Sequence, residues 1–162
     1  MENELKVVDI FIGTTLRGSA KGSGRVMYIM RTKRKNGSDY EAAPQIVEYD
    51  NTTESESVLR AIRDALQRLH YACTVVIHTE CSNVSAAITQ HWPEKWQHNG
   101  WKSAKGNPVK NAVLWEMLLQ DVEEGGHILL AEGEKHEYAE WMRFNMPLKR
   151  TLKDIFTEVP KI

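Results

Sequence analysis

The sequence predicts an α/β protein whose core is one mixed sheet of five strands, three antiparallel and then two parallel, flanked by helices. Residues 7–49 contain three apolar or β-branched runs separated by turn residues, a pattern typical of an antiparallel meander. Apolar residues then recur at helical spacing over 58–69, and the continuous apolar run 74–79 predicts a buried strand. A strand–helix–strand order of this length favours a crossover connection and a parallel pair.

Turn and cap residues separate the expected elements. Asn36-Gly37 predicts a hairpin turn, residues 51–53 supply caps for a helix, and Gly125-Gly126 ends a later one. No regular element is predicted for the Trp-rich stretch 91–107. We expect strands over residues 7–12, 26–32, 43–49, 74–79 and 127–131, and helices after residue 53 and over 82–90, 109–123 and 135–145.

Length and composition fit one ordinary globular domain, which we place at residues 1–146 of the 162, with an amphipathic tail at 147–162. No apolar run approaches the roughly 20 residues of a membrane helix, and the polar start lacks a signal-peptide layout. Cys73 and Cys81 suggest two reduced thiols rather than a disulfide framework. These features predict a cytoplasmic protein with no membrane partner.

Charge is unevenly distributed although the net charge is only −1. Residues 1–36 hold eight Lys and Arg against three acids, and residues 94–110 hold four Lys against one. Such asymmetry is compatible with a basic face for phosphates, and equally with a solvated surface of mixed charge.

Residues 88–115, ITQHWPEKWQHNGWKSAKGNPVKNAVLW, carry a specific resemblance. Trp96, the Gly100-Trp101-Lys102 step, Lys105, the Pro108-Val109-Lys110-Asn111 run and Leu114-Trp115 resemble the basic handle of bacterial type 1 ribonucleases H. Weaker similarity extends over about residues 7–145, and the order of strands and helices is also that of this family. The resemblance implies a ribonuclease H-like fold.

The resemblance also implies a chemistry that this sequence only partly matches. The family's enzymes cleave the RNA strand of an RNA–DNA hybrid with two divalent metals, usually Mg²⁺, held by four carboxylates. The first carboxylate position, at the end of the first strand, falls on Gly13. Asp9, four residues back, lies roughly 13 Å away along a strand and is too far to substitute.

The second position, in the first turn of the first long helix, falls on Val58, or on Ser57 after a shift of one residue. Neither is acidic, although Glu56 is nearby and a local shift would make it a substitute. Glu54 and Glu56 also suit the positive end of a helix dipole.

The remaining two positions keep a carboxylate on a longer side chain. The third falls on Glu80, after the central strand, and the fourth on Glu140, on the last helix. The family's loop histidine is replaced by Glu134, with His136 either standing in for it or exposed to solvent. We therefore expect Glu80 and Glu140 to be remnant catalytic positions that hold a metal weakly at best, with Mg²⁺ or Mn²⁺ a cofactor only if activity remains.

The positions that contact nucleic acid in the family are better matched by this sequence than the carboxylate positions are. Thr53 and Asn111 fall where the family grips a DNA phosphate, and Arg17, Lys21 and Arg25 lie in or beside the Gly-rich first loop. The handle mixes cations with flat apolar surface, as phosphate binding and stacking require. Its candidate binding residues are Lys95, Trp96, Lys102, Lys105 and Lys110.

Three functions follow as hypotheses. The first is a catalytically impaired or inactive ribonuclease H-like protein that binds RNA–DNA hybrid or double-stranded RNA by its shape. The second is a residual metal-dependent endoribonuclease that uses Glu80, Glu140 and a shifted Glu56. The third is a protein-interaction scaffold that docks through the tail at 147–162.

Overall fold

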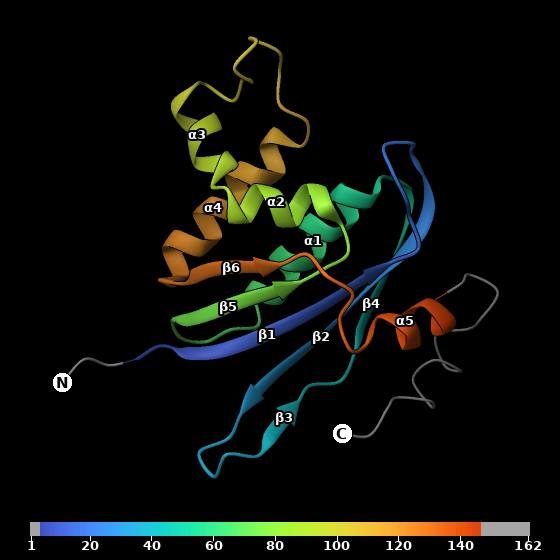
Figure 1. Cartoon of the computed structure of the whole chain (residues 1–162), viewed down its shortest axis with the longest axis vertical. Helices are drawn as coiled ribbons and strands as arrows, with labels where there is room; N and C mark the ends of the chain where they lie inside the picture. Colours follow the sequence, from blue (N-terminus) through green and yellow to red (C-terminus); the bar gives the residue numbers. More distant parts are fainter. Residues whose placement is uncertain (1–3, 147–162) are drawn as a thin grey trace.

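A computed structural model describes residues 4–146 of the chain (Figure 1). It contains six strands and five helices within that range. The strands are β1 (Lys6–Thr14), β2 (Gly22–Lys33), β3 (Asp39–Glu41), β4 (Gln45–Thr52), β5 (Cys73–His78) and β6 (Ile128–Glu132). The helices are α1 (Glu54–Leu66), α2 (Ser82–Thr89), α3 (Trp92–His98), α4 (Ala112–Gly125) and α5 (Ala139–Asn145).

The strands form one mixed sheet in the order β3-β2-β1-β5-β6, with β4 also paired to β2. The β1–β2, β2–β3 and β2–β4 pairs are antiparallel, and the β1–β5 and β5–β6 pairs are parallel. The predicted mixed α/β fold is therefore confirmed.

The sheet has six strands rather than the predicted five, because the strand expected over 43–49 corresponds to β4 and the short strand β3 precedes it as an element that was not predicted. Glu41 ends β3 and Gln45 begins β4, and Pro44 lies buried between them. Proline has no N–H to donate to a sheet ladder, so pairing with β2 breaks at this point.

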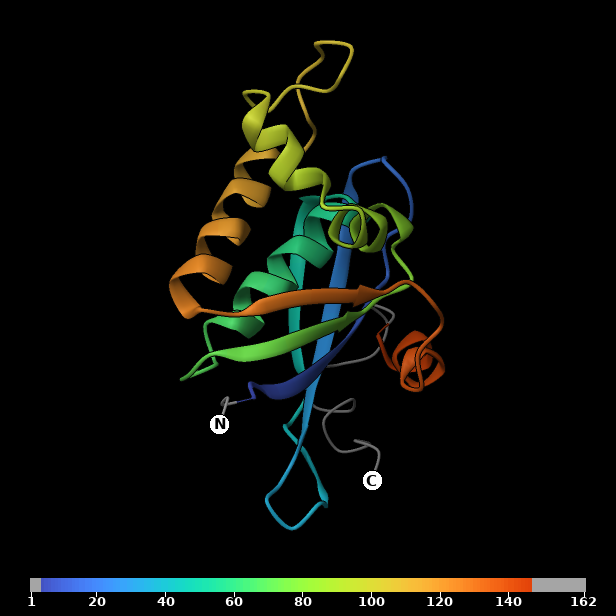
Figure 2. The same cartoon turned by 60° about the vertical axis from the view of Figure 1, so that its left-hand side comes forward.

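Helices cover both faces of the sheet (Figure 2). Successive residues of β1 point to opposite faces, as in any strand. Ile10 and Ile12 belong to the larger core with α1, α2 and α4, whereas Phe11 belongs to a smaller core with α5. Arg63 of α1 donates to Asp121 of α4 over 2.8 Å, which joins the two long helices. The smaller core places α5 alongside the end of β1.

Capping residues that are recognisable in the sequence set the helix ends. The Thr53 hydroxyl accepts a hydrogen bond from the Glu56 N–H (3.2 Å) and caps α1. Gly126 closes α4 with φ of 68°, a left-handed conformation that glycine adopts without strain. Helix α5 begins at Ala139, later than the predicted start at residue 135, because His136 is tied to β1.

We call residues 92–111 the handle; they comprise α3 and the loop that leads to α4, and they project beyond the sheet (Figure 1). Helix α3 is an element that the sequence did not predict. Three bends use left-handed non-glycine residues, His91, Trp101 and Asn111, each strained by about 1 kcal/mol or more. A bridge between Lys102 and Pro108 closes the loop.

Both cysteines are buried and free of disulfides. Within residues 4–146, no helix is long and apolar enough to cross a membrane. The tail at 147–162 lies outside the described residues.

Candidate functional site

A cleft of about 270 Å³ lies where β1 and β5 end, with α5 as its opposite wall. The first turn of α1 contributes Glu54, and the β5–α2 junction contributes Thr79, Glu80 and Cys81. Carboxyl ends of adjacent parallel strands meet at one edge of a sheet, which explains why residues so far apart in sequence share one cleft.

Gly13 lies in this cleft, on β1, and two methionines of α5 fill the space beside it. A Cβ atom at Gly13 would stand 2.8 Å from the Met142 Sδ and 3.0 Å from the Met146 Cε. Both methionines are buried, at 1% and 2% exposure. The end of β1 is therefore packed against thioether side chains.

The structure distinguishes between Ser57 and Val58, which the sequence left open. The Ser57 hydroxyl donates to the Glu54 carbonyl oxygen (2.8 Å) and lies 2.9 Å from the Thr14 hydroxyl. Since a hydroxyl has one hydrogen, Thr14 is the donor in that second contact. Val58 is buried in the larger core. Ser57 is therefore the residue that α1 places beside the end of β1.

Glu56 lies on another side of α1. Its carboxylate accepts from the Thr52 hydroxyl (3.1 Å) and pairs with Arg60 (3.5 Å). It is not among the residues that line the cleft. Glu54, which does line it, accepts a hydrogen bond from the Gly18 N–H over 3.1 Å.

Glu80 lies in the cleft and is held by an arginine. Arg143 donates from Nη2 to both Glu80 carboxylate oxygens, at 2.9 and 3.3 Å. Both side chains are roughly half exposed, and an exposed pair of this kind contributes at most about 1 kcal/mol to stability. The charged group that faces Glu80 across the cleft is thus a cation.

Glu140 lies outside the cleft although it is on the same helix. Ala139, Met142, Arg143 and Met146 form the cleft-facing side of α5 at the spacing of a helical face. Glu140 is instead bonded to Lys135, with its side chain 74% exposed, and that hydrogen bond and positive charge lower its carboxyl pKa. The sequence analysis missed Arg143, which the same i, i+3, i+4, i+7 spacing would have revealed.

His136 is buried, so the expectation of a solvent-exposed loop histidine is wrong. Its Nε2 donates to the Ile12 carbonyl oxygen (2.8 Å), and its Nδ1 accepts from the Tyr138 N–H (3.2 Å). Burial lowers the pKa of this imidazole. His136 therefore lines the cleft and fixes the loop before α5 to β1.

The Asp9 carboxylate also has a structural partner, which is His78. Its carboxylate lies 2.7 Å from the His78 Nε2, and the His78 ring stacks on Phe11 with centroids 4.4 Å apart. Among residues 4–146, no group of three or more His, Cys, Asp or Glu side chains is arranged to hold a metal ion.

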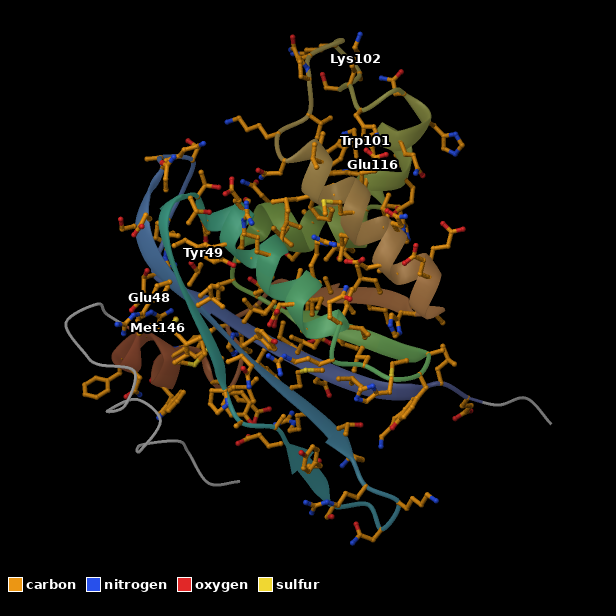
Figure 3. The ribbon with its side chains drawn as sticks, turned by 180° about the vertical axis from the view of Figure 1, so that it is seen from behind. Glu48, Tyr49, Trp101, Lys102, Glu116 and Met146 are labelled. Atoms are coloured by element: carbon orange, nitrogen blue, oxygen red, sulfur yellow. The ribbon has the colours of Figure 1, made fainter. Side chains whose placement is uncertain are left out.

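The handle presents its cations and Trp92 to solvent and keeps Trp96 and Trp101 partly packed. All four candidate lysines are exposed, whereas Trp96 and Trp101 are half-buried against the larger core. Trp96 meets Trp115 edge to face, with ring centroids 6.1 Å apart. Figure 3 shows Lys102 at the outer end of the handle loop and Trp101 closer to α4. The exposed lysines are Lys95, Lys102, Lys105 and Lys110.

The other candidate nucleic-acid contacts also include both engaged or buried side chains and exposed ones. Asn111 is half-buried at the start of α4, and the Thr53 hydroxyl is used to cap α1. Arg25 of β2 is only 4% exposed and pairs with Glu48 over 2.6 Å, so it is not available to an external phosphate. Arg17 and Lys21, by contrast, are exposed.

The sheet order, the helices on both faces and the projecting handle define a ribonuclease H-like domain. The sequence profile of the RNase H family matches residues 13–131. A ribonuclease H of Thermoanaerobacter sp. is 30% identical over 121 residues, which cover 74% of this chain and 73% of that protein. A ribonuclease H of Caldicellulosiruptor saccharolyticus is 39% identical over 71 residues, 44% of this chain and 49% of that protein. The chain belongs to the ribonuclease H family.

Solved structures show the same fold at low sequence identity. A type 1 RNase H with the type 2 active-site motif matches with a TM-score of 0.67 at 19% identity, covering 88% of this chain and 72% of that chain. A foamy viral protease–reverse transcriptase in complex with RNA/DNA hybrid matches with a TM-score of 0.61 at 14% identity, covering 80% of this chain and 17% of that chain.

Proposed function

We propose that this chain binds RNA–DNA hybrid through the exposed lysines of its handle and cleaves it poorly or not at all. The observation that carries the proposal is the packing of Gly13 against Met142 and Met146. A two-metal site needs an oxygen ligand at the end of β1, and here that space belongs to sulfur and methyl groups.

The charges of the cleft also argue against a two-metal site. A Mg²⁺ ion bound by Glu80 would stand beside the Arg143 guanidinium, which contacts both oxygens of that carboxylate. A guanidinium also repels a divalent cation at that distance. The donor set therefore does not fit the family's pair of metals, and Glu54 and Glu80 alone supply too few oxygen ligands.

The handle supports binding independently of the carboxylates. Three of its four exposed lysines, Lys102, Lys105 and Lys110, fall on positions that match the family's basic handle, and the half-buried Trp96 and Trp101 hold the loop in place. Lysine contacts to phosphates release counterions, so affinity should fall steeply as salt is raised. Recognition of this kind reads the shape of a hybrid or RNA duplex rather than its base sequence.

One labelled RNA–DNA hybrid, studied in Mg²⁺, Mn²⁺ or EDTA, tests the proposal. We expect binding in all three conditions, weakened by salt and competed by double-stranded RNA, with the RNA strand intact. Metal-dependent cleavage that disappears in Glu80→Gln contradicts it and supports a residual nuclease. Absence of both binding and cleavage leaves a protein-interaction scaffold, whose proposed docking element at 147–162 lies outside the described residues.

A further inference from the structure

The cleft at the ends of β1 and β5 contains two arginines that the handle's function does not use. Arg143 reaches it from α5 and Arg17 from the loop after β1. The Arg17 Nη1 donates to the carbonyl oxygens of Thr14 and Leu16, both at 2.7 Å. These bonds fix the guanidinium without neutralising it, and in the described part of the chain Arg17 makes no salt bridge.

Arg143 does have an ionic partner, but one that an incoming anion is able to displace. Its pair with Glu80 is half exposed on both sides, and such pairs are weak in water. Arginine binds phosphate through paired N–H groups, a geometry that matches carboxylate and phosphate equally well. The Glu80 carboxylate thus occupies the place that a phosphate would take on Arg143.

The position of the cleft relative to the handle favours one source for that phosphate. The chain leaves the cleft at Cys81, and α2 leads directly to α3 of the handle. Helix α2 has eight residues, so it spans only roughly 12 Å. A nucleic acid lying on the handle therefore has neighbouring phosphates within reach of the cleft.

We propose that Arg143 and Arg17 bind a backbone phosphodiester of that nucleic acid in the cleft without a metal ion, and that Glu80 is the internal competitor that the phosphodiester displaces from Arg143. This inference rests on the proposed function. It gives the cleft a binding role in which the positive charge comes from the protein itself. It also reverses the expected role of Glu80, whose removal improves binding instead of abolishing it.

Fluorescence anisotropy on a labelled RNA–DNA hybrid in EDTA tests this assignment. Arg143→Gln should weaken binding about tenfold and reduce the salt slope by about one unit. Glu80→Gln should strengthen binding several-fold, and the double variant should bind like Arg143→Gln alone. Arg60→Gln and Glu56→Gln are the controls, because Arg60 and Glu56 also form an ion pair but lie on α1 and do not line the cleft.

The controls separate a failure of this inference from a failure of the proposed function. If Arg143→Gln behaves like Arg60→Gln while Lys102→Gln/Lys105→Gln loses binding, the cleft assignment is overturned and the handle assignment stands.

Titration of inorganic phosphate, followed by NMR of the arginine Nε–H groups, examines the cleft without nucleic acid. We expect shifts at Arg143 and Arg17 and none at Arg60. Such shifts in a protein that does not bind hybrid support the cleft and overturn the proposed function. No shift at either arginine overturns the cleft assignment.

Discussion

The handle and the cleft hold their charged side chains in opposite ways. In the handle the lysines extend into solvent, while tryptophans packed on the core hold the loop in place. In the cleft, Glu80 is neutralised by Arg143, and the methionines of α5 close over Gly13. The exposed cations and the cleft therefore lie on different elements of the fold, so the charge of one is able to change without altering the other.

The largest expected effect comes from adding a methyl group at the end of β1. Gly13→Ala should lower the free energy of unfolding by about 1–3 kcal/mol, because its Cβ collides with Met142 and Met146 in a packed core. Urea denaturation measures this change. Gly22→Ala is the control, since its Cβ meets only the Leu16 Cδ2 at 3.8 Å.

A double variant sharpens that result. If the methionine packing is the cause, Gly13→Ala should cost markedly less in a Met142→Ala background, where the sulfur is gone. An equal cost in both backgrounds would show that the end of β1 is not closed by α5.

The next effect concerns the handle. Lys102→Gln/Lys105→Gln should weaken hybrid binding about tenfold and lower the slope of log affinity against log salt by about two units, one for each lysine that no longer neutralises a phosphate. Anisotropy measured over a series of salt concentrations gives both values. Lys33→Gln/Lys35→Gln, at the exposed end of β2 and in the turn after it, carries the same charge change and should leave both values close to wild type.

A smaller effect is expected from the buried histidine of the loop before α5. Burial lowers the pKa of His136 in the folded state, so the unfolded chain binds its proton first. Stability is therefore complete above the unfolded value of about 6.5 and is lost as pH falls through it toward the folded pKa. His136→Gln should lose less stability than wild type between pH 7.5 and 5.5, as thermal denaturation would record; equal losses would contradict the assignment.

The smallest effect is expected at Glu140, which points away from the cleft toward Lys135. Glu140→Gln should leave hybrid affinity and melting temperature unchanged, because an exposed pair on a short helix adds little. A loss of hybrid binding or of metal-dependent cleavage in this variant would place Glu140 in the site after all.

Apolar runs, apolar residues at helical spacing and capping residues made most of the fold predictable. Thr53 and Gly126 set helix ends as expected. The break at Pro44 was readable from the missing N–H but was overlooked. Helix α3 escaped prediction because seven residues with charged and aromatic side chains carry no clear apolar period.

The site was less predictable than the fold. Matching Glu140 to the family by its carboxyl group ignored the helical face that carries Met142, Arg143 and Met146. The choice between Ser57 and Val58 depended on the register of α1 against β1, which only the Thr14–Ser57 contact revealed. Sequence reasoning placed residues in most of the elements, but side-chain direction at the cleft needed three-dimensional packing.

The most direct test of the account is single-turnover incubation of labelled hybrid with excess protein in Mn²⁺, beside Glu80→Gln and an EDTA control. The account predicts that the RNA strand remains intact in all three, while the hybrid is bound in each and is bound more tightly by Glu80→Gln. Cleavage by the wild-type chain that needs metal and vanishes in Glu80→Gln would contradict it, because the cleft would then hold cations rather than exclude them.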